Sequence, residues 1–171
     1  MVTIQSGTIP LFPITMALDI TIKDLPARHL TGMVIRTNMQ NAWTDCPAIW
    51  QTFAPRLASF PNSAAITEAY GLSIMVSDDG TFDYWVAAET LADAPVPEDM
   101  KTVELPAGLY ASVFAPNLQQ MEAVYQEMYT EWSQQQSEFT VNMQAPCVEV
   151  YRTGWTSHDP LEIWVPVIKN V

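Results

Sequence analysis

Alternating apolar and polar residues predict several β-strands along the chain. From Ile14 to Ile22 every second residue is large and apolar, which is the period of a half-buried strand. β-Branched residues are frequent between Leu30 and Arg36. Two further apolar stretches, 70–77 and 82–89, are joined by Asp78-Asp79-Gly80, a strong hairpin-turn sequence. The first half of the chain therefore predicts four strands.

Two other stretches have apolar residues at helical spacing. The first is predicted to run from Pro47, which suits the first turn of a helix, to Ser59. The second is predicted from Asn117 to Gln135, and Gln120 lies three residues after Asn117, as in a capping box. Its apolar stripe consists of Leu118, Met121, Tyr125, Met128 and Trp132.

The two halves of the chain resemble each other in sequence. Three segments recur in the same order at nearly one offset: 24–27 and 104–107, 49–51 and 124–126, 83–86 and 162–165. Strands predicted over 109–115, 147–153 and 161–168 complete the second unit, and the segment 91–100, with two prolines, is expected to connect the halves. This pattern indicates an internal duplication.

We therefore predict a single α+β domain over residues 1–171. Two strand-helix-strand-strand units, about 14–90 and 101–168, are expected to form a pseudo-two-fold antiparallel sheet. The helices are expected on one face of this sheet and a ligand cleft on the other.

Charge and composition exclude several classes of protein. The chain has 7 Lys and Arg against 19 Asp and Glu, a net charge of −12, so we expect no direct contact with nucleic acid and no membrane binding. No apolar run is long enough to span a bilayer, and the segment 1–22 lacks the basic start of a signal peptide, which predicts a cytoplasmic protein. Two cysteines and two histidines are too few for a disulfide framework or a zinc site. We expect neither a metal nor a cofactor.

Five short motifs occur in order: Leu25-Pro26-Ala27, Tyr70-Gly71-Leu72-Ser73, 79–84, 105–111 and 162–167. Together they resemble the GyrI-like effector-binding domain over about 14–167. That domain ends AraC-type and MerR-type multidrug-sensing regulators, and it also occurs alone in gyrase-inhibitory proteins and in drug-binding proteins of integron cassettes. Only about 13 residues precede the first predicted strand. We therefore expect no DNA-binding domain, and any transcription regulator or protein partner would act in trans.

Strand alternation also suggests a ligand site. Glu149 and Tyr151 share one face of their strand, and Glu162 and Trp164 share one face of the next. We expect all four on the open face, because their β-branched neighbours suit packing against helices. The other candidate ligand-binding residues are Trp85, Met75, Tyr110, Phe114 and Trp43.

A carboxylate among aromatic rings selects a lipophilic cation, because ring faces and the negative charge both attract it. The resemblance implies that Glu149, the acid of a Glu-Val-Tyr strand, meets cationic drugs, and Glu162 ranks second. The leading hypothesis is a stand-alone binding module for hydrophobic cations, a sink or a sensor.

Two alternatives stay open. Some GyrI-like proteins hydrolyse strained electrophiles, and Glu149 and Glu162 would then form an acid/base pair. A third hypothesis is an inhibitory protein-interaction module of the gyrase-inhibitor type, whose acidic surface mimics DNA. We assign no catalytic residue.

Overall fold

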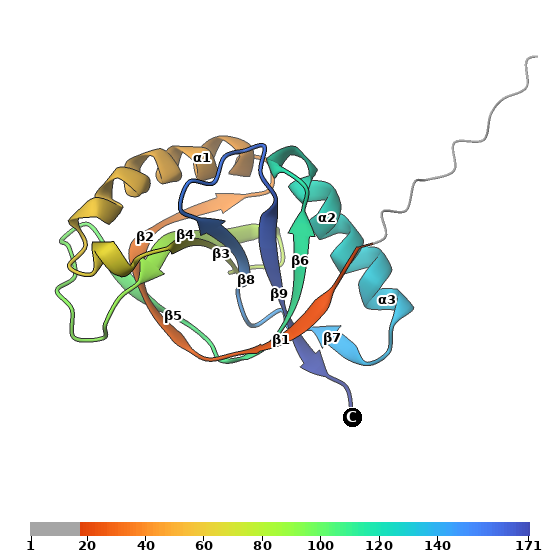
Figure 1. Ribbon diagram of the computed structural model, residues 1–171. Coiled ribbons are helices and arrows are strands. Elements are labelled where there is room, and N and C mark those ends of the chain that lie inside the picture. Colours follow the sequence, from red (N-terminus) through yellow and green to blue (C-terminus); the bar gives the residue numbers. More distant parts are fainter. Residues whose placement is uncertain (1–17) are drawn as a thin grey trace, which may run out of the picture.

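The computed structural model describes residues 18–171 and shows one curled antiparallel sheet with helices on its outer face (Figure 1). The strands are β1 Thr21–Leu25, β2 Arg28–Asn38, β3 Glu68–Met75, β4 Thr81–Glu89, β5 Lys101–Leu105, β6 Gly108–Ala115, β7 Phe139–Val141, β8 Cys147–Arg152 and β9 Leu161–Lys169. Their spatial order is β1-β6-β9-β8-β3-β4-β2-β5, and β7 pairs with β9. The α+β class predicted from the sequence is confirmed.

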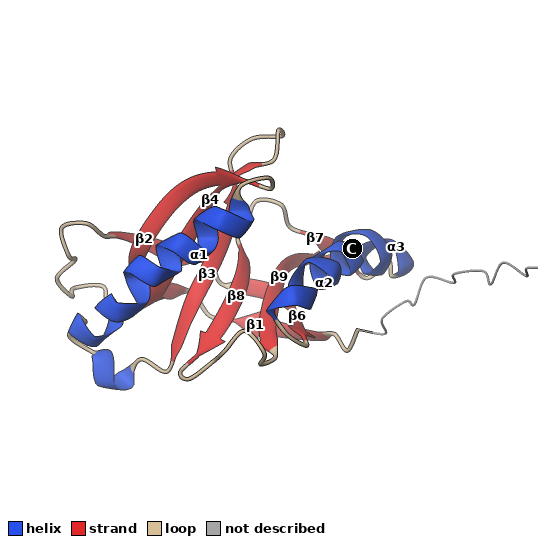
Figure 2. Cartoon of the chain, turned by 90° about the horizontal axis from the view of Figure 1, so that it is seen from above, coloured by secondary structure: helices blue, strands red, loops and turns tan. Residues whose placement is uncertain are grey.

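Two helical segments cover the sheet. The first is α1, Ala42–Phe53, which continues as a 3-10 turn over Ala54–Ser59; a short 3-10 turn follows at Ser63–Ala65. The second begins with a 3-10 turn, Leu118–Gln120, and continues as α2 Met121–Glu127, a π-helical turn Met128–Trp132 and α3 Ser133–Gln135. Both segments lie on the same face of the sheet, as predicted (Figure 2).

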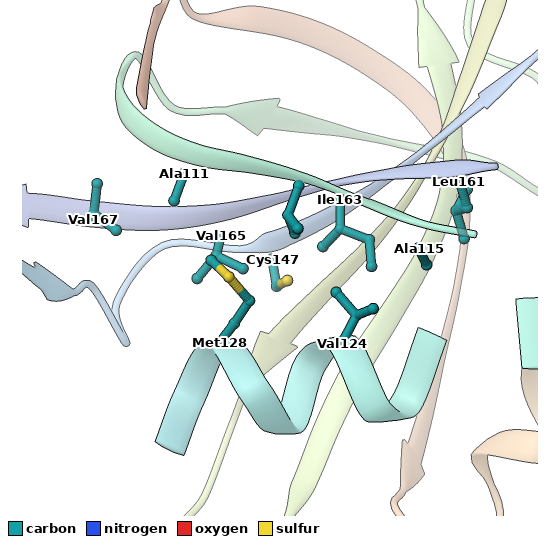
Figure 3. Packing of buried hydrophobic residues seen from close by; sticks show 10 residues of the cluster. Ala111, Ala115, Val124, Met128, Cys147, Leu161, Ile163, Val165 and Val167 are labelled. Atoms are coloured by element: carbon teal, nitrogen blue, oxygen red, sulfur yellow. The ribbon is translucent and has the colours of Figure 1, made fainter. Parts of the chain in front are cut away.

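Each helix buries an apolar stripe against its own half of the sheet. On α1, Ile49 and Phe53 are buried with side chains of β4. Val124 of α2 and Met128 of the π-helical turn point into a cluster that includes Val165 of β9 (Figure 3). The predicted N-cap is present before α2, because the Asn117 side chain accepts a hydrogen bond from the backbone N–H of Gln120.

The boundaries differ from the prediction in three places. Helix α1 begins at Ala42, so Pro47 lies inside the helix; the helix follows a turn in which the Asn38 side chain accepts from the N–H of Gln40 and Asn41. The first strand begins at Thr21, and residues 14–17 of the predicted strand lie outside the described part of the chain. Strands β5 and β7 were not predicted as separate elements; both are short.

The duplication is visible in the strand order. From the centre of the sheet outward, one half reads β3-β4-β2-β5 and the other reads β8-β9-β6-β1. The first strand of each repeat therefore pairs with the other repeat: β1 with β6 and β5 with β2. Because each half supplies an outer strand to the other, the two repeats complete one shared sheet.

The inner face of the curled sheet is filled by side chains. Tyr70, Leu72, Tyr110, Val150 and Trp164 belong to one buried cluster there. Within residues 18–171, no helix has the length and apolar character needed to cross a bilayer.

Candidate functional site

A cavity of about 1180 Å³ lies between the two helical segments, on the outer face of the sheet. Helix α1 contacts β2 and β4 while α2 contacts β6, so the central strands β3 and β8 are left uncovered between them (Figure 2). Trp50 and Tyr125 line it from the two helices, and Ser73 and Glu149 line it from the sheet. The cleft expected on the opposite face is therefore found on the helix-bearing face.

Glu149 is the buried charge of this cavity, with a residue exposure of 6%. The hydroxyls of Tyr84 and Tyr151 donate to its Oε2 at 2.9 and 2.7 Å, and the hydroxyl of Tyr125 lies 3.4 Å from its Oε1. Within residues 18–171 no Lys, Arg or His forms an ion pair with it. The carboxylate is hydrogen-bonded but its charge is not neutralised.

Burial raises the pKa of Glu149 above its ordinary value of 4.5, and the three tyrosine hydrogen bonds only partly oppose this. The same burial, together with the nearby carboxylate, holds the pKa values of Tyr84 and Tyr151 well above 10. These phenols therefore remain protonated and keep donating to Glu149. A positive charge placed in the cavity would favour the ionised carboxylate.

A glycine makes room for this arrangement. Gly71 of β3 lies opposite Glu149 of β8. A Cβ at this position would lie 2.5 Å from the Tyr84 hydroxyl oxygen and 2.7 Å from Glu149 Oε2. Trp50 also fixes Tyr84, because its indole N–H donates to the Tyr84 hydroxyl at 2.8 Å. The floor of the cavity is thus set by contacts from both helices and both central strands.

Aromatic side chains form much of the wall. The rings of Trp50 and Tyr151 lie 4.6 Å apart between centroids, and Trp155 meets Tyr151 edge-on at 4.8 Å. On the α2 side, Tyr125 and Tyr129 are stacked at 6.5 Å. Such a wall can stack on a flat ring system and offers ring faces to a cation.

Four of the predicted residues line the cavity: Glu149, Tyr151, Met75 and Trp43. Met75 and Trp43 are 44% and 52% exposed, so both can be reached by a ligand. Trp50, Tyr84 and Tyr125 also line the cavity and were not predicted as site residues; Tyr125 was placed only in the apolar stripe of its helix. A signal was present, because Trp50 and Tyr125 occupy matching positions of the two repeats.

The five remaining predicted residues lie on the inner face, away from this cavity. They are Glu162, Trp164, Trp85, Tyr110 and Phe114. The prediction placed Glu149 on the same face as Glu162, and this is wrong. In β8, Val148 and Val150 pack inside the curled sheet, so alternation turns Glu149 and Tyr151 towards the helices. The two carboxylates are on opposite faces and cannot act as an acid/base pair on one substrate.

Glu162 has structural partners on that inner face. Its Oε1 accepts hydrogen bonds from Lys23, Ser112 and Trp164, and its Oε2 accepts one from Arg152 at 2.6 Å. Burial alone would raise the pKa of Glu162, but these donors together lower it to about 2. Glu162 is therefore a paired carboxylate that joins four strands.

Both cysteines line the cavity and are free thiols. Burial raises the pKa of Cys46 and of Cys147 to about 12, so both are protonated at neutral pH and are weak nucleophiles. Across residues 18–171 no group of three His, Cys, Asp or Glu side chains is arranged to hold a metal ion.

Residues 18–168 match the family model of the GyrI-like small molecule binding domain. A search of curated proteins gives no significant match. Among solved structures, a putative bacterial transcription regulation protein from Staphylococcus aureus MU50 is 23% identical, with a TM-score of 0.65 and coverage of 88% of this chain and 98% of that one. SAV2435 bound to tetraphenylphosphonium is 21% identical, with a TM-score of 0.62 and coverage of 88% and 94%.

Two other solved structures share the fold. The Vibrio cholerae integron cassette protein VCH_CASS2 is 17% identical, with a TM-score of 0.60 and coverage of 87% of this chain and 95% of that one. A hydrolase from Listeria innocua is 8% identical, with a TM-score of 0.55 and coverage of 87% and 91%. At these identities the likeness concerns the fold.

Proposed function

This chain belongs to the GyrI-like small-molecule-binding domain family, and we propose that it binds hydrophobic organic cations between α1 and α2. The observation that carries this proposal is the state of Glu149, a buried carboxylate with three tyrosine donors and no basic partner within residues 18–171. An unpaired buried charge is costly, and a ligand cation removes that cost. An anion at the same place would increase the energetic cost of the buried negative charge.

The shape and lining of the cavity support the same class of ligand. Its volume of about 1180 Å³ can hold a compound with several rings. The rings of Trp50, Tyr151 and Trp155 provide faces and edges for stacking, and Met75 offers a flexible apolar contact. The solved structure of SAV2435 with tetraphenylphosphonium, which has the same fold, is consistent with a lipophilic cation here.

Direct titration tests this proposal. Tetraphenylphosphonium and a rhodamine dye should bind in calorimetry or fluorescence anisotropy, and an organic anion of similar size should not. A lack of cation binding at about 100 μM ligand, where even a free energy near −5 kcal/mol would be detected, would refute the proposal.

Binding of this kind suits a drug sink or a sensor. With 7 basic residues against 19 acidic ones, these 171 residues are poorly suited to contact DNA, so a sensor role requires a DNA-binding part outside them, such as a partner protein. Pull-down of a regulator that is released or captured on adding the cation would favour the sensor. A lower concentration of free drug in cells that produce this protein but no such partner would favour the sink.

Hydrolysis is the second candidate function, and a specific observation favours it. Burial raises the pKa of Glu149, which brings this carboxyl closer to the range of a general base at neutral pH. In this role Glu149 would act with the tyrosines around it, without Glu162. Turnover of a cyclopropane-bearing alkylating agent by the wild type, lost in Glu149→Gln, would support hydrolysis; unchanged substrate with the wild type would exclude it.

A further inference from the structure

The two ends of the cavity differ, and the strand register shows which residues belong to each end. Gly71 of β3 lies opposite Glu149, near the middle of the cavity floor. Ser73 and Met75 follow Gly71 on the same face of β3, because alternate residues of a strand share a face. Met75 is four residues beyond Gly71, so this end of the floor lies about 13 Å along the strand from the level of Glu149.

Four large apolar side chains from separate segments line this end. The last residues of β2 and β3 both pair with the start of β4, so Met39, directly after β2, lies at the same end of the sheet as Met75. Trp43 is in the first turn of α1, which follows, and Met143 is in the segment before β8, whose first residue pairs with Ser73. We call Met39, Trp43, Met75 and Met143 the methionine end of the cavity.

The methionine end is exposed although it is apolar. The exposed fractions are 67% for Met39, 52% for Trp43, 44% for Met75 and 57% for Met143. Where a soluble protein gathers exposed apolar side chains, the place is commonly one that binds a ligand or a partner. Methionine is unbranched and flexible, so such a surface can adapt to apolar chains of different shape.

No charged side chain among the described lining residues lies at the methionine end. Apart from Glu149, the charged residues of the lining are Glu68, Arg152 and Glu122. Glu68 and Arg152 pair in register at the opposite end of β3 and β8, where they form an ion pair. Glu122 is in the first turn of α2, next to the loop between β8 and β9. The methionine end therefore suits an apolar group and offers no partner to an ionic one.

The other side of Glu149 is lined by aromatic rings that are held in place. Tyr151 follows Glu149 on the same face of β8 and donates to it at 2.7 Å. The ring of Tyr151 also contacts Trp50 and Trp155, with centroids 4.6 and 4.8 Å away. Glu149 therefore lies between fixed aromatic rings on one side and flexible apolar side chains on the other.

Resting on the proposed function, we propose that the methionine end is a subsite for a flexible apolar tail, and that the ligands of this cavity are amphiphilic cations. The positive headgroup pairs with Glu149, and the tail runs along β3 to Met75 and covers the exposed methionines. Burial of the tail removes apolar surface of both ligand and protein from water. A compact cation leaves this end uncovered, so tail length should determine affinity.

A series of N-alkylpyridinium ions tests this inference. The headgroup is constant, and the chain is extended from ethyl to hexadecyl at concentrations below micelle formation. Kd for the wild type should fall by up to about fourfold for each added methylene and level off near decyl, once the chain spans the ~13 Å to Met75. Decyl sulfate has the same tail and the opposite charge, and it should not bind.

The double variant Met39→Gln/Met143→Gln tests where the tail lies. Glutamine is similar in length to methionine but polar, and both positions are exposed and lie outside helices and strands, so the fold should tolerate the change. The ratio of Kd for ethylpyridinium to Kd for decylpyridinium should fall about tenfold in this variant. Leu91→Gln is the matched control with an unchanged ratio, because Leu91 is 71% exposed but does not line the cavity.

Oxidation of the wild type supplies a second measurement that needs no variant. Decylpyridinium should protect Met39, Met75 and Met143 from sulfoxide formation by dilute peroxide, measured by mass spectrometry, and ethylpyridinium should not. A Kd that is independent of tail length, a ratio that the double variant leaves unchanged, unprotected methionines or equally tight binding of decyl sulfate would each overturn the inference. The proposed function would still stand if tetraphenylphosphonium binds. Failure to bind tetraphenylphosphonium and every pyridinium would overturn both.

Discussion

Replacing Glu149 by glutamine isolates the charge of the cavity from its shape. An amide oxygen at the Oε2 position still accepts from Tyr84 and Tyr151, and the amide nitrogen can donate to the Tyr125 hydroxyl. The hydrogen bonds persist while the negative charge disappears. Loss of a charged partner weakens binding by about 1–3 kcal/mol, so Kd for a cation should rise about 5- to 150-fold.

The same substitution should leave the stability of the folded protein unchanged or raise it at neutral pH, although it weakens cation binding. Because burial raises the pKa of Glu149 above 4.5, the folded protein binds this proton more tightly than the unfolded chain does. The stabilisation that this bound proton gives the folded protein is fully present below pH 4.5. It is lost as the pH rises through the raised pKa of Glu149. Glu149→Gln avoids that loss, so its Tm should equal or exceed that of the wild type at neutral pH, and the difference should shrink on acidification.

Two measurements check this reasoning. Affinity for a cationic dye and for its neutral isostere should be determined for wild type and Glu149→Gln, with Tm measured for both proteins from neutral pH down to about pH 4.5. An equal loss of affinity for both ligands would mean that the side chain shapes the cavity and does not recognise charge. A marked fall in Tm at neutral pH would mean that Glu149 has a stabilising cationic partner.

Three other outcomes are expected. Cation binding should weaken as the pH falls through the raised pKa of Glu149, and this pH dependence should be absent from Glu149→Gln when both are titrated by calorimetry. Glu162→Gln should lower the free energy of unfolding by about 1 kcal/mol, because Lys23 and Arg152 are 39% and 51% exposed and can return to solvent, while cation affinity stays unchanged. Since the pKa of Glu162 is lowered to about 2, this difference should be present above 4.5 and vanish as the pH falls through about 2 in urea unfolding curves. Gly71→Ala should cost about 1–3 kcal/mol of stability and weaken cation binding, because its Cβ displaces Tyr84 and Glu149; wild-type affinity in that variant would contradict the described floor.

The sequence predicted the fold well because the duplication constrains it. Matching segments in the two halves require matching elements, and polar-apolar alternation located most strands. Strands β5 and β7 escaped prediction because five or three residues carry too little periodic signal. The start of α1 was placed at Pro47 since proline favours the first turn, yet the turn at Asn38 begins the helix earlier.

The site was predicted less well, because alternation shows which residues share a face but not which face is which. Val148 and Val150 were assigned to the helices, but the inner face of a curled sheet is just as apolar. The faces of β8 and of β3, which carries Met75, were therefore reversed, and a single predicted site was divided between two faces. Gly71 was the available clue, since a glycine within a strand often marks a close approach by another group.

Each repeat supplies an outer strand to the other, so neither repeat forms its half of the sheet alone. This arrangement helps to explain why one unpaired carboxylate lies near the centre of a symmetric sheet. Separate copies of one repeat would have to associate as a two-fold dimer to complete their sheets, and each residue lining the shared cavity would then occur twice. Two glutamates facing one another would hold one of the pair protonated, and two serines would supply no charge. In the single polypeptide, Asp83 of β4 matches Glu162 of β9 in the sequence repeat, and their neighbours in the sheet are Ile74 of β3 and Val150 of β8. Ser73 in β3 is therefore the counterpart of Glu149 in β8. Covalent linkage thus permits an unequal pair of walls, and this inequality leaves one buried, unpaired carboxylate in the cavity as residues 18–171 describe it.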